Sequence, residues 1–173
     1  MRFAFRRLFC GVCLVLLPVL AQASGFEAGL RGGFDAAGNE ENFSLIEATL
    51  QKTYGWQKEL GVGVFKTRWN ASLGYLEASG EGAALLSAGG DLVYEMADGL
   101  LALDVGFRPM LLSEHSFDEE DLGGPLQFGS HAGVALAIDR FVLSYRFEHI
   151  SNAGIYSRNP GVNMHMIGLG ARF

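Results

Sequence analysis

The segment FVLSYRFEHIS, residues 141–151, alternates between two kinds of side chain along most of its length. The odd-numbered residues, which form one parity of the segment, are all apolar or aromatic as far as Phe147. The even-numbered residues, which form the other parity, are mainly polar or charged. The two sets are Phe141, Leu143, Tyr145 and Phe147 on the first parity, and Val142, Ser144, Arg146 and Glu148 on the second. Because successive side chains of a β-strand point to opposite faces, this pattern predicts a strand with one apolar face.

The same two-residue period recurs along the rest of the chain. It is clear in residues 26–34, 69–79, 101–108 and 163–173, and less regular near residues 43–53, 84–96 and 127–138. Together with residues 141–151, these segments make eight predicted strands of about ten residues. The acidic, glycine-rich link from Ser113 to Pro125 is the longest predicted loop. No internal repeat or linker interrupts the pattern, which predicts a single domain.

The first 23 residues have the features of a secretory signal peptide. Met1 to Arg7 contains three arginines and no acidic residue, residues 8–20 are apolar, and residues 21–23 read Ala-Gln-Ala, a typical cleavage site. The apolar run is too short for a membrane-spanning helix, which needs about 20 residues. We therefore expect cleavage after Ala23 and a mature domain of residues 24–173.

The composition of the mature chain excludes several functions. Both cysteines, Cys10 and Cys13, lie in the leader, so disulfide and thiolate-metal chemistry are not expected. Loss of the leader removes three of the 13 basic residues and no acidic residue, so the net charge changes from −6 to −9. No basic stripe of the kind that binds nucleic acid is visible. The spacing of His, Asp and Glu residues does not indicate a metal site.

An exported, glycine-rich chain with alternating strands and no further long apolar run indicates an all-β protein of the outer membrane. The prediction is an eight-stranded antiparallel transmembrane β-barrel, with glycines and charged residues in a narrow lumen and the apolar parity facing lipid. A soluble antiparallel barrel or sandwich would also alternate and is the alternative. The terminal Phe173, preceded at two-residue spacing by Ala171, Leu169 and Ile167, resembles the signature recognised by outer-membrane assembly machinery. This ending favours the membrane barrel.

Three polar residues fall on the parity that is predicted to face lipid. Counting on from Phe147 reaches His149 and Ser151, and counting back from Phe173 reaches Asn163. A barrel with an even number of strands has both termini in the periplasm, so the loop between its last two strands is extracellular. The three residues are therefore expected at the outer-leaflet rim. In a Gram-negative outer membrane, the lipid at that rim is lipopolysaccharide.

A histidine and a serine that are two residues apart on one strand can act as base and nucleophile. Their backbones are separated by about 6.5–7 Å, a distance that an imidazole leaning along the strand can bridge. Asn163 on the next strand could orient the imidazole by accepting a hydrogen bond. The backbone near Ala153 and Gly154, or the side chain of Asn159, could stabilise an oxyanion. The alternative is that these are ordinary polar residues of the interfacial girdle.

The sequence HISNAG at residues 149–154, followed by Asn-Pro-Gly at residues 159–161, resembles the motif of the PagL-type lipid A 3-O-deacylases. These proteins are eight-stranded outer-membrane barrels. The resemblance implies that Ser151 is the nucleophile and that His149 is the base. It also implies that Asn152, Ala153, Gly154 and Asn159 belong to the oxyanion region and its loop. The implied reaction removes the 3-O-linked hydroxyacyl chain from lipid A of lipopolysaccharide, with no metal or organic cofactor.

One position departs from the family pattern. The best-known members carry a glutamate where this chain has Asn163. An amide can orient the imidazole, but it brings no negative charge to stabilise an imidazolium ion. The sequence leaves open whether the protein is a homodimer. It also leaves open a catalytically inactive barrel with a structural or adhesion role, whereas a transport channel is disfavoured because eight strands leave little lumen.

Overall fold

The computed structural model describes residues 25–36, 42–118 and 120–173. The predicted signal peptide, residues 1–23, lies outside the described residues. Within the described ranges, no helix is both long and apolar enough to cross a membrane.

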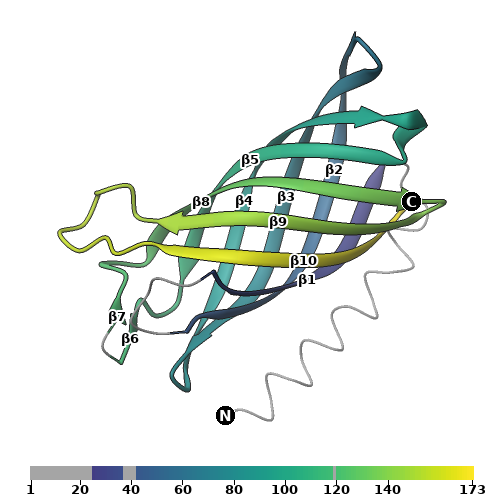
Figure 1. The fold of residues 1–173 in the computed structure, drawn as a ribbon. Helices are drawn as coiled ribbons and strands as arrows, with labels where there is room; N and C mark the ends of the chain where they lie inside the picture. The colour runs from purple at the N-terminus through teal and green to yellow at the C-terminus, as the bar shows by residue number, and fades with distance from the viewer. Residues whose placement is uncertain (1–24, 37–41, 119) are drawn as a thin grey trace.

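The described chain folds into a closed barrel of eight antiparallel strands, which confirms the predicted fold class (Figure 1). Around the barrel the order is β1-β10-β9-β8-β5-β4-β3-β2, so strands that follow one another in the chain lie side by side and β1 pairs with β10. The barrel strands are β1 (Phe26–Asp35), β2 (Ser44–Leu60), β3 (Gly63–Ala78), β4 (Glu81–Met96), β5 (Leu101–Leu112), β8 (Leu126–Ile138), β9 (Phe141–Ser151) and β10 (Val162–Arg172).

The two ends of the barrel differ in their connections. Gly25 and Phe173 meet at one end, where the Gly25 N–H donates to the Phe173 carbonyl at 2.8 Å. We call this the terminal end; it also carries the short turns after β2, β4 and β8, including a 3₁₀ turn at Ala97–Gly99. The opposite end, called the loop end, carries the β3–β4, β5–β8 and β9–β10 connections. The β5–β8 connection contains a small separate hairpin of β6 (Ser116–Phe117) and β7 (Glu120–Asp121).

Side chains alternate around the wall as the sequence predicts. On β9 the four residues of the apolar parity are exposed on the outer surface, whereas Val142, Arg146 and Glu148 are buried inside the barrel. All eight predicted strands are present. Their predicted length is wrong for β2, β3 and β4, which have 17, 16 and 16 residues. In β2 a register shift between Thr53 and Gln57 interrupts the pairing with β3, so the sequence pattern stops at Thr53 although the strand continues.

Apolar side chains fill the lumen at the loop end. The buried cluster joins residues of the barrel wall to Phe117 and Leu122 of the β5–β8 connection, and Phe117 contacts Phe43 edge-on at 5.3 Å between ring centroids. Its members are Phe43, Leu45, Leu76, Ala78, Ala83, Leu85, Met110, Leu112, Phe117, Leu122, Ile150, Val162, Met164 and Met166. The barrel is therefore closed at this end by a packed core.

Charged side chains fill the middle of the lumen, and Arg108 stands at their centre. Its guanidinium, with only 1% of the residue exposed, forms ion pairs with Glu148 at 2.6 Å and with Glu47 at 2.7 Å. Glu47 also pairs with Arg31 at 2.8 Å, so two arginines balance two carboxylates. Buried charges are tolerated only when each has such a partner.

A second balanced group lies closer to the terminal end. Arg68 and Arg146 pair with Asp91 and Asp104 at distances of 2.9 to 3.8 Å. The His131 imidazole lies 3.2 Å from Asp104, which places this histidine in the lumen. The residues of the two groups come from seven strands, β1, β2, β3, β4, β5, β8 and β9. Arg31–Glu47 and Arg68–Asp91 join neighbouring strands, whereas the two ion pairs of Arg108 join β5 to the non-adjacent strands β2 and β9.

Arg108→Met should destabilise the barrel strongly, because it leaves Glu47 short of one cation and Glu148 without its ion-pair partner in a closed lumen. We expect a loss of about 3–5 kcal/mol in the free energy of unfolding. Urea unfolding in lipid vesicles, followed by heat-modifiable migration on a gel, measures it. The control is Arg140→Met at an exposed turn residue, expected within about 0.5 kcal/mol of the unmodified chain. Equal unfolding midpoints for the two variants would show that the lumen pairs do not hold the barrel together.

Candidate active site

The end of β9 places a histidine beside an asparagine on the outer surface. His149 is opposite Asn163 in the register of β9 with β10, and its Nδ1 lies 2.8 Å from Asn163 Oδ1. An amide oxygen can only accept a hydrogen bond, so Nδ1 carries the hydrogen. The Nε2 lone pair is then available to accept a proton. The pairing of the last two strands therefore sets the tautomer that a base needs.

Ser151 is the last residue of β9 and shares the outward parity of His149. Among the described residues, the Ser151 hydroxyl makes no hydrogen bond to the imidazole, although the two positions are only two residues apart. Contacts of this kind are often long before a substrate binds. The β8 partner of Ser151 is Phe128, whose ring stacks on Phe107 at 5.6 Å between centroids. The serine thus stands beside an aromatic wall on the outer face of the barrel.

Asn152 organises the β9–β10 loop from within. The residue is fully buried, and its Oδ1 accepts a hydrogen bond from the Gly154 N–H at 2.9 Å. Its Nδ2 donates to the carbonyls of Leu122 at 2.9 Å and Arg158 at 2.5 Å. Each side-chain polar atom of Asn152 therefore has a partner, and the bond to Leu122 ties the loop to the β5–β8 connection.

Other contacts fasten the same two connections together. The Tyr156 hydroxyl accepts a hydrogen bond from the Leu126 N–H at 3.4 Å, and Arg158 lies 3.7 Å from the Asp121 carboxylate. Hydrogen bonds from the Gly123 N–H and then from the His115 imidazole hold the pKa of Asp121 below its ordinary value. Asp121 is therefore charged at neutral pH and able to pair with Arg158.

The predicted oxyanion donors differ in their availability. The Asn152 N–H donates to Asn159 Oδ1 at 2.9 Å, and the Gly154 N–H is occupied by the Asn152 side chain. Neither the Ala153 N–H nor the Asn159 amide nitrogen donates to another described residue. Ala153 also has a positive φ of 53°, a conformation that is uncommon without glycine. The loop thus leaves two of the predicted donors unoccupied near the end of β9.

Two residues that the motif analysis did not assign contact the same surface. Gly161 has a φ of +73°, and a Cβ at this position would lie 3.0 Å from His149 Cε1, so a side chain here would press on the imidazole. His165, two residues after Asn163, accepts or donates a hydrogen bond with the Tyr145 hydroxyl at 2.8 Å. Its ring lies among Phe34, Tyr145 and Phe147. The outward parity of His165 was visible in the sequence, whereas the contact of Gly161 requires the fold.

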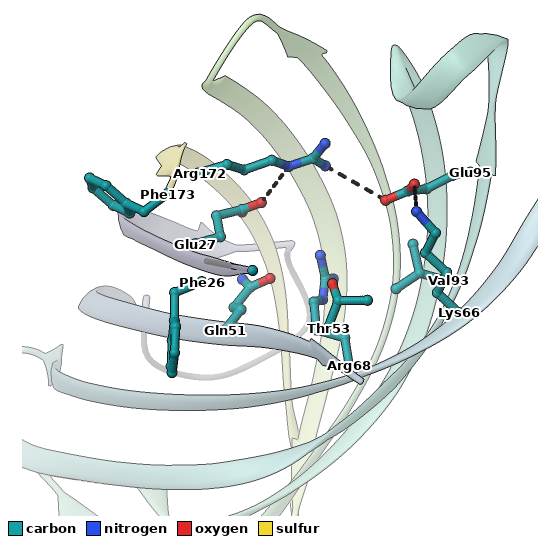
Figure 2. A pocket seen from close by; sticks show the side chains of 11 residues that line it. Phe26, Glu27, Gln51, Thr53, Lys66, Arg68, Val93, Glu95, Arg172 and Phe173 are labelled. Atoms are coloured by element: carbon teal, nitrogen blue, oxygen red, sulfur yellow. Dashed lines mark hydrogen bonds and ion pairs between the residues drawn. The ribbon is translucent and has the colours of Figure 1, made fainter. Parts of the chain in front are cut away.

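A cavity lies away from this site, at the terminal end of the barrel. It has a volume of about 290 Å³ and is lined by residues at the mouth of the lumen (Figure 2). Figure 2 shows Arg172 between Glu27 and Glu95, with Lys66 paired to Glu95. Each of these charges has a partner, and none of them is near His149. Within the described residues, no group of three or more His, Cys, Asp or Glu side chains could hold a metal ion.

The architecture by itself defines the class of this protein. A closed barrel with apolar side chains outside and a packed, charge-balanced lumen is the form of an outer-membrane β-barrel protein. The sequence model of the family described as "Lipid A 3-O-deacylase (PagL)" matches residues 45–172, and the chain belongs to this family. The matched range includes all of the predicted site residues.

Two known proteins are similar to this chain. "Lipid A deacylase PagL" of Bordetella bronchiseptica (strain ATCC BAA-588 / NCTC 13252 / RB50) is 33% identical over 63 residues. That match covers 36% of this chain and 35% of the relative, so it spans about a third of the relative's length. A structure described as "Crystal structure of the outer membrane enzyme PagL" has a TM-score of 0.71 at 21% identity, covering 84% of this chain and 100% of the other. This second likeness shows a shared fold.

Asn152→Ala should loosen the β9–β10 loop, because it removes the acceptor for Gly154 and the donor to the carbonyls of Leu122 and Arg158. We expect the free energy of local loop opening to fall by about 1–3 kcal/mol. Trypsin cleavage after the exposed Arg158 of the folded barrel should become roughly tenfold faster or more. The matched control is Ser157→Ala, an exposed residue of the same loop, which should leave the rate unchanged. An equal rate in both variants would contradict the organising role of Asn152.

Proposed function

We propose that this protein is an outer-membrane esterase that removes the 3-O-linked hydroxyacyl chain from lipid A of lipopolysaccharide. The observation that carries the proposal is the hydrogen bond of 2.8 Å between His149 Nδ1 and Asn163 Oδ1, on the outer face and two residues from Ser151. Membership of the lipid A 3-O-deacylase family and the name of the Bordetella relative support the same substrate.

The orientation of the barrel supports a site in the outer leaflet. With both chain ends on one side, the usual topology of such barrels places the terminal end in the periplasm and the loop end outside. The predicted signal peptide would direct the export that this requires. His149 and Ser151 then lie at the level where lipopolysaccharide meets the barrel wall. The acyl chains of lipid A can lie along Phe147, Tyr145 and Leu143, which are exposed below them.

The proposed reaction passes through an acyl-enzyme. His149 Nε2 takes the proton of the Ser151 hydroxyl as the serine oxygen attacks the ester carbonyl carbon at position 3 of the glucosamine. The bond to the sugar oxygen breaks, and that oxygen leaves with the proton from His149. A water molecule, deprotonated by His149, then attacks the carbonyl carbon of the acyl-serine. The bond to Ser151 Oγ breaks, His149 returns the proton to that oxygen, and the hydroxy fatty acid leaves. The Ala153 N–H and the Asn159 amide are the candidate donors to the oxyanion.

Asn163 has a narrower role than the glutamate of the family motif. Its amide oxygen holds the Nδ1 hydrogen and so fixes the orientation of the ring. It does not neutralise the positive charge that develops when His149 takes the serine proton. A carboxylate at this position would do both, because a hydrogen bond to a charged acceptor is roughly twice as strong.

Ser151→Ala and His149→Ala should each abolish deacylation while leaving the barrel folded. We expect the rate to fall at least about a thousandfold, since nucleophile and base act as a unit. Mass spectrometry of lipid A from cells that express each variant would show whether one hydroxyacyl chain is lost. Ser157→Ala is the control and should retain activity. Unchanged lipid A in cells with the folded unmodified protein would leave the inactive structural barrel as the better interpretation.

Asn163→Asp should increase the rate of deacylation, roughly tenfold or more, because the new carboxylate stabilises the imidazolium ion in the transition state. Asn163→Ala should decrease it, because the imidazole loses its orienting partner. Initial rates on purified lipopolysaccharide in mixed micelles measure both changes. If both substitutions leave the initial rate of deacylation unchanged, Asn163 does not assist His149.

A further inference from the structure

The last part of β2 extends beyond the strand that should cover its edge. β1 pairs with β2 only as far as the contact of Phe26 with Lys52, whereas β2 continues to Leu60. Among the described residues, Gln57–Leu60 therefore pairs on one side only, with β3, and Tyr54–Trp56 lies in the register shift of that pairing. We call Tyr54–Leu60 and the turn residues Gly61 and Val62 the β2 extension. In Figure 1 it projects past the neighbouring wall at the terminal end of the barrel.

The outward parity of β2 continues through the register shift. Before the shift Thr53 is opposite Arg68, and after it Gln57 is opposite Lys66, so two extra residues lie on β2. An even number of extra residues preserves the alternation of faces. The outward set of the extension is Tyr54, Trp56, Lys58 and Leu60, and the inward set is Gly55, Gln57 and Glu59. The outer face of the extension therefore carries two aromatic residues, a leucine and a lysine, whereas its inner face carries a glycine and two polar residues.

The outer face of the extension is exposed and continues into the lipid-facing wall. Half of Trp56 and 85% of Val62 are accessible. Across the strand pair, Lys58 is opposite Phe65, whose ring lies 4.6 Å from that of Tyr94. The Tyr94 hydroxyl donates to the Leu60 carbonyl at 2.8 Å and so fixes the extension to β4.

An aromatic band at the base of the extension has the composition of a membrane interface. The Lys52 ammonium lies 4.5 Å from the centre of the Phe26 ring, and Phe26 contacts Trp69 edge-on at 6.3 Å. Tyr, Trp and Lys are the residues that gather where hydrocarbon meets headgroups. The extension repeats these residue types further from the barrel.

We infer that the outer face of the β2 extension binds the phospholipid headgroup region of the leaflet at the terminal end. Lys58 in the middle of this face favours lipid, because lysine is depleted from the buried core of protein interfaces but can reach a phosphate from an interfacial stem. Addition of a further strand to the open edge is disfavoured by the irregular pairing and by the adjacent charges of Lys58 and Glu59. The extension would thereby increase the surface that this eight-stranded barrel presents to lipid headgroups.

Trp69→Phe tests the inference, because the chain contains two tryptophans and this variant leaves Trp56 as the reporter. In phosphatidylethanolamine–phosphatidylglycerol vesicles we expect Trp56 emission to shift to shorter wavelength than in a denatured sample. Lipids brominated close to the glycerol should quench it more strongly than lipids brominated near the chain ends. Acrylamide in the water should quench it weakly.

The matched control moves the tryptophan to the opposite face. Glu59→Trp, combined with Trp69→Phe and Trp56→Phe, should give a reporter that acrylamide quenches strongly and brominated lipid weakly. Heat-modifiable migration verifies that both variants are folded. Equal acrylamide quenching of both reporters would overturn the inference. Protection of Trp56 from acrylamide that increases with the protein-to-lipid ratio would also overturn it, because it would show that a second copy of the protein covers the outer face of the extension. Neither readout needs lipid A or activity, so the result is independent of the proposed reaction.

Discussion

The closure of the barrel by β1 and β10 is the constraint on which the rest of the structure depends. In a hydrocarbon environment each backbone N–H and C=O needs a partner within the protein, and an open sheet would leave two unpaired edges. The pairing of residues 27–35 with residues 164–172 removes those edges. It also holds β10 in register with β9, which places Asn163 opposite His149. The geometry of the candidate site is thus a consequence of closure.

Closure divides the polar residues into two groups with different tasks. Inside, arginines and carboxylates neutralise one another, and Arg108 by itself contacts partners on four other strands. These pairs are enclosed, so they can hold the wall but cannot meet a lipid. Outside, His149, Asn163 and Ser151 share the outer face of β9 and β10. A reaction on a membrane lipid therefore belongs on the outer face, and the proposed function takes its nucleophile and base from that face and its oxyanion donors from the adjacent β9–β10 loop.

Much of this arrangement could be predicted from the sequence because the two-residue period is a local property. Alternation in residues 141–151 identified the outer and inner faces of β9, including the outward position of His149 and Ser151. The pattern failed in the second half of β2, where a register shift, Gly55 and an outward Lys58 hide the strand. It also could not show that Asn152 is fully buried and holds the β9–β10 loop, because its partner Leu122 is 30 residues away in the chain.

The sequence by itself determined the number of barrel strands, the face on which side chains lie in the regularly alternating strands, and the motif that indicates a serine and a histidine. These follow from neighbours along the chain, whose relative directions are set by backbone geometry. Only the tertiary structure decided which residues stand opposite one another. The contact of His149 with Asn163, the close approach of Gly161 and the ion pairs of Arg108 all depend on strand register. Register is fixed by closure and packing of the whole barrel, and no short segment contains that information.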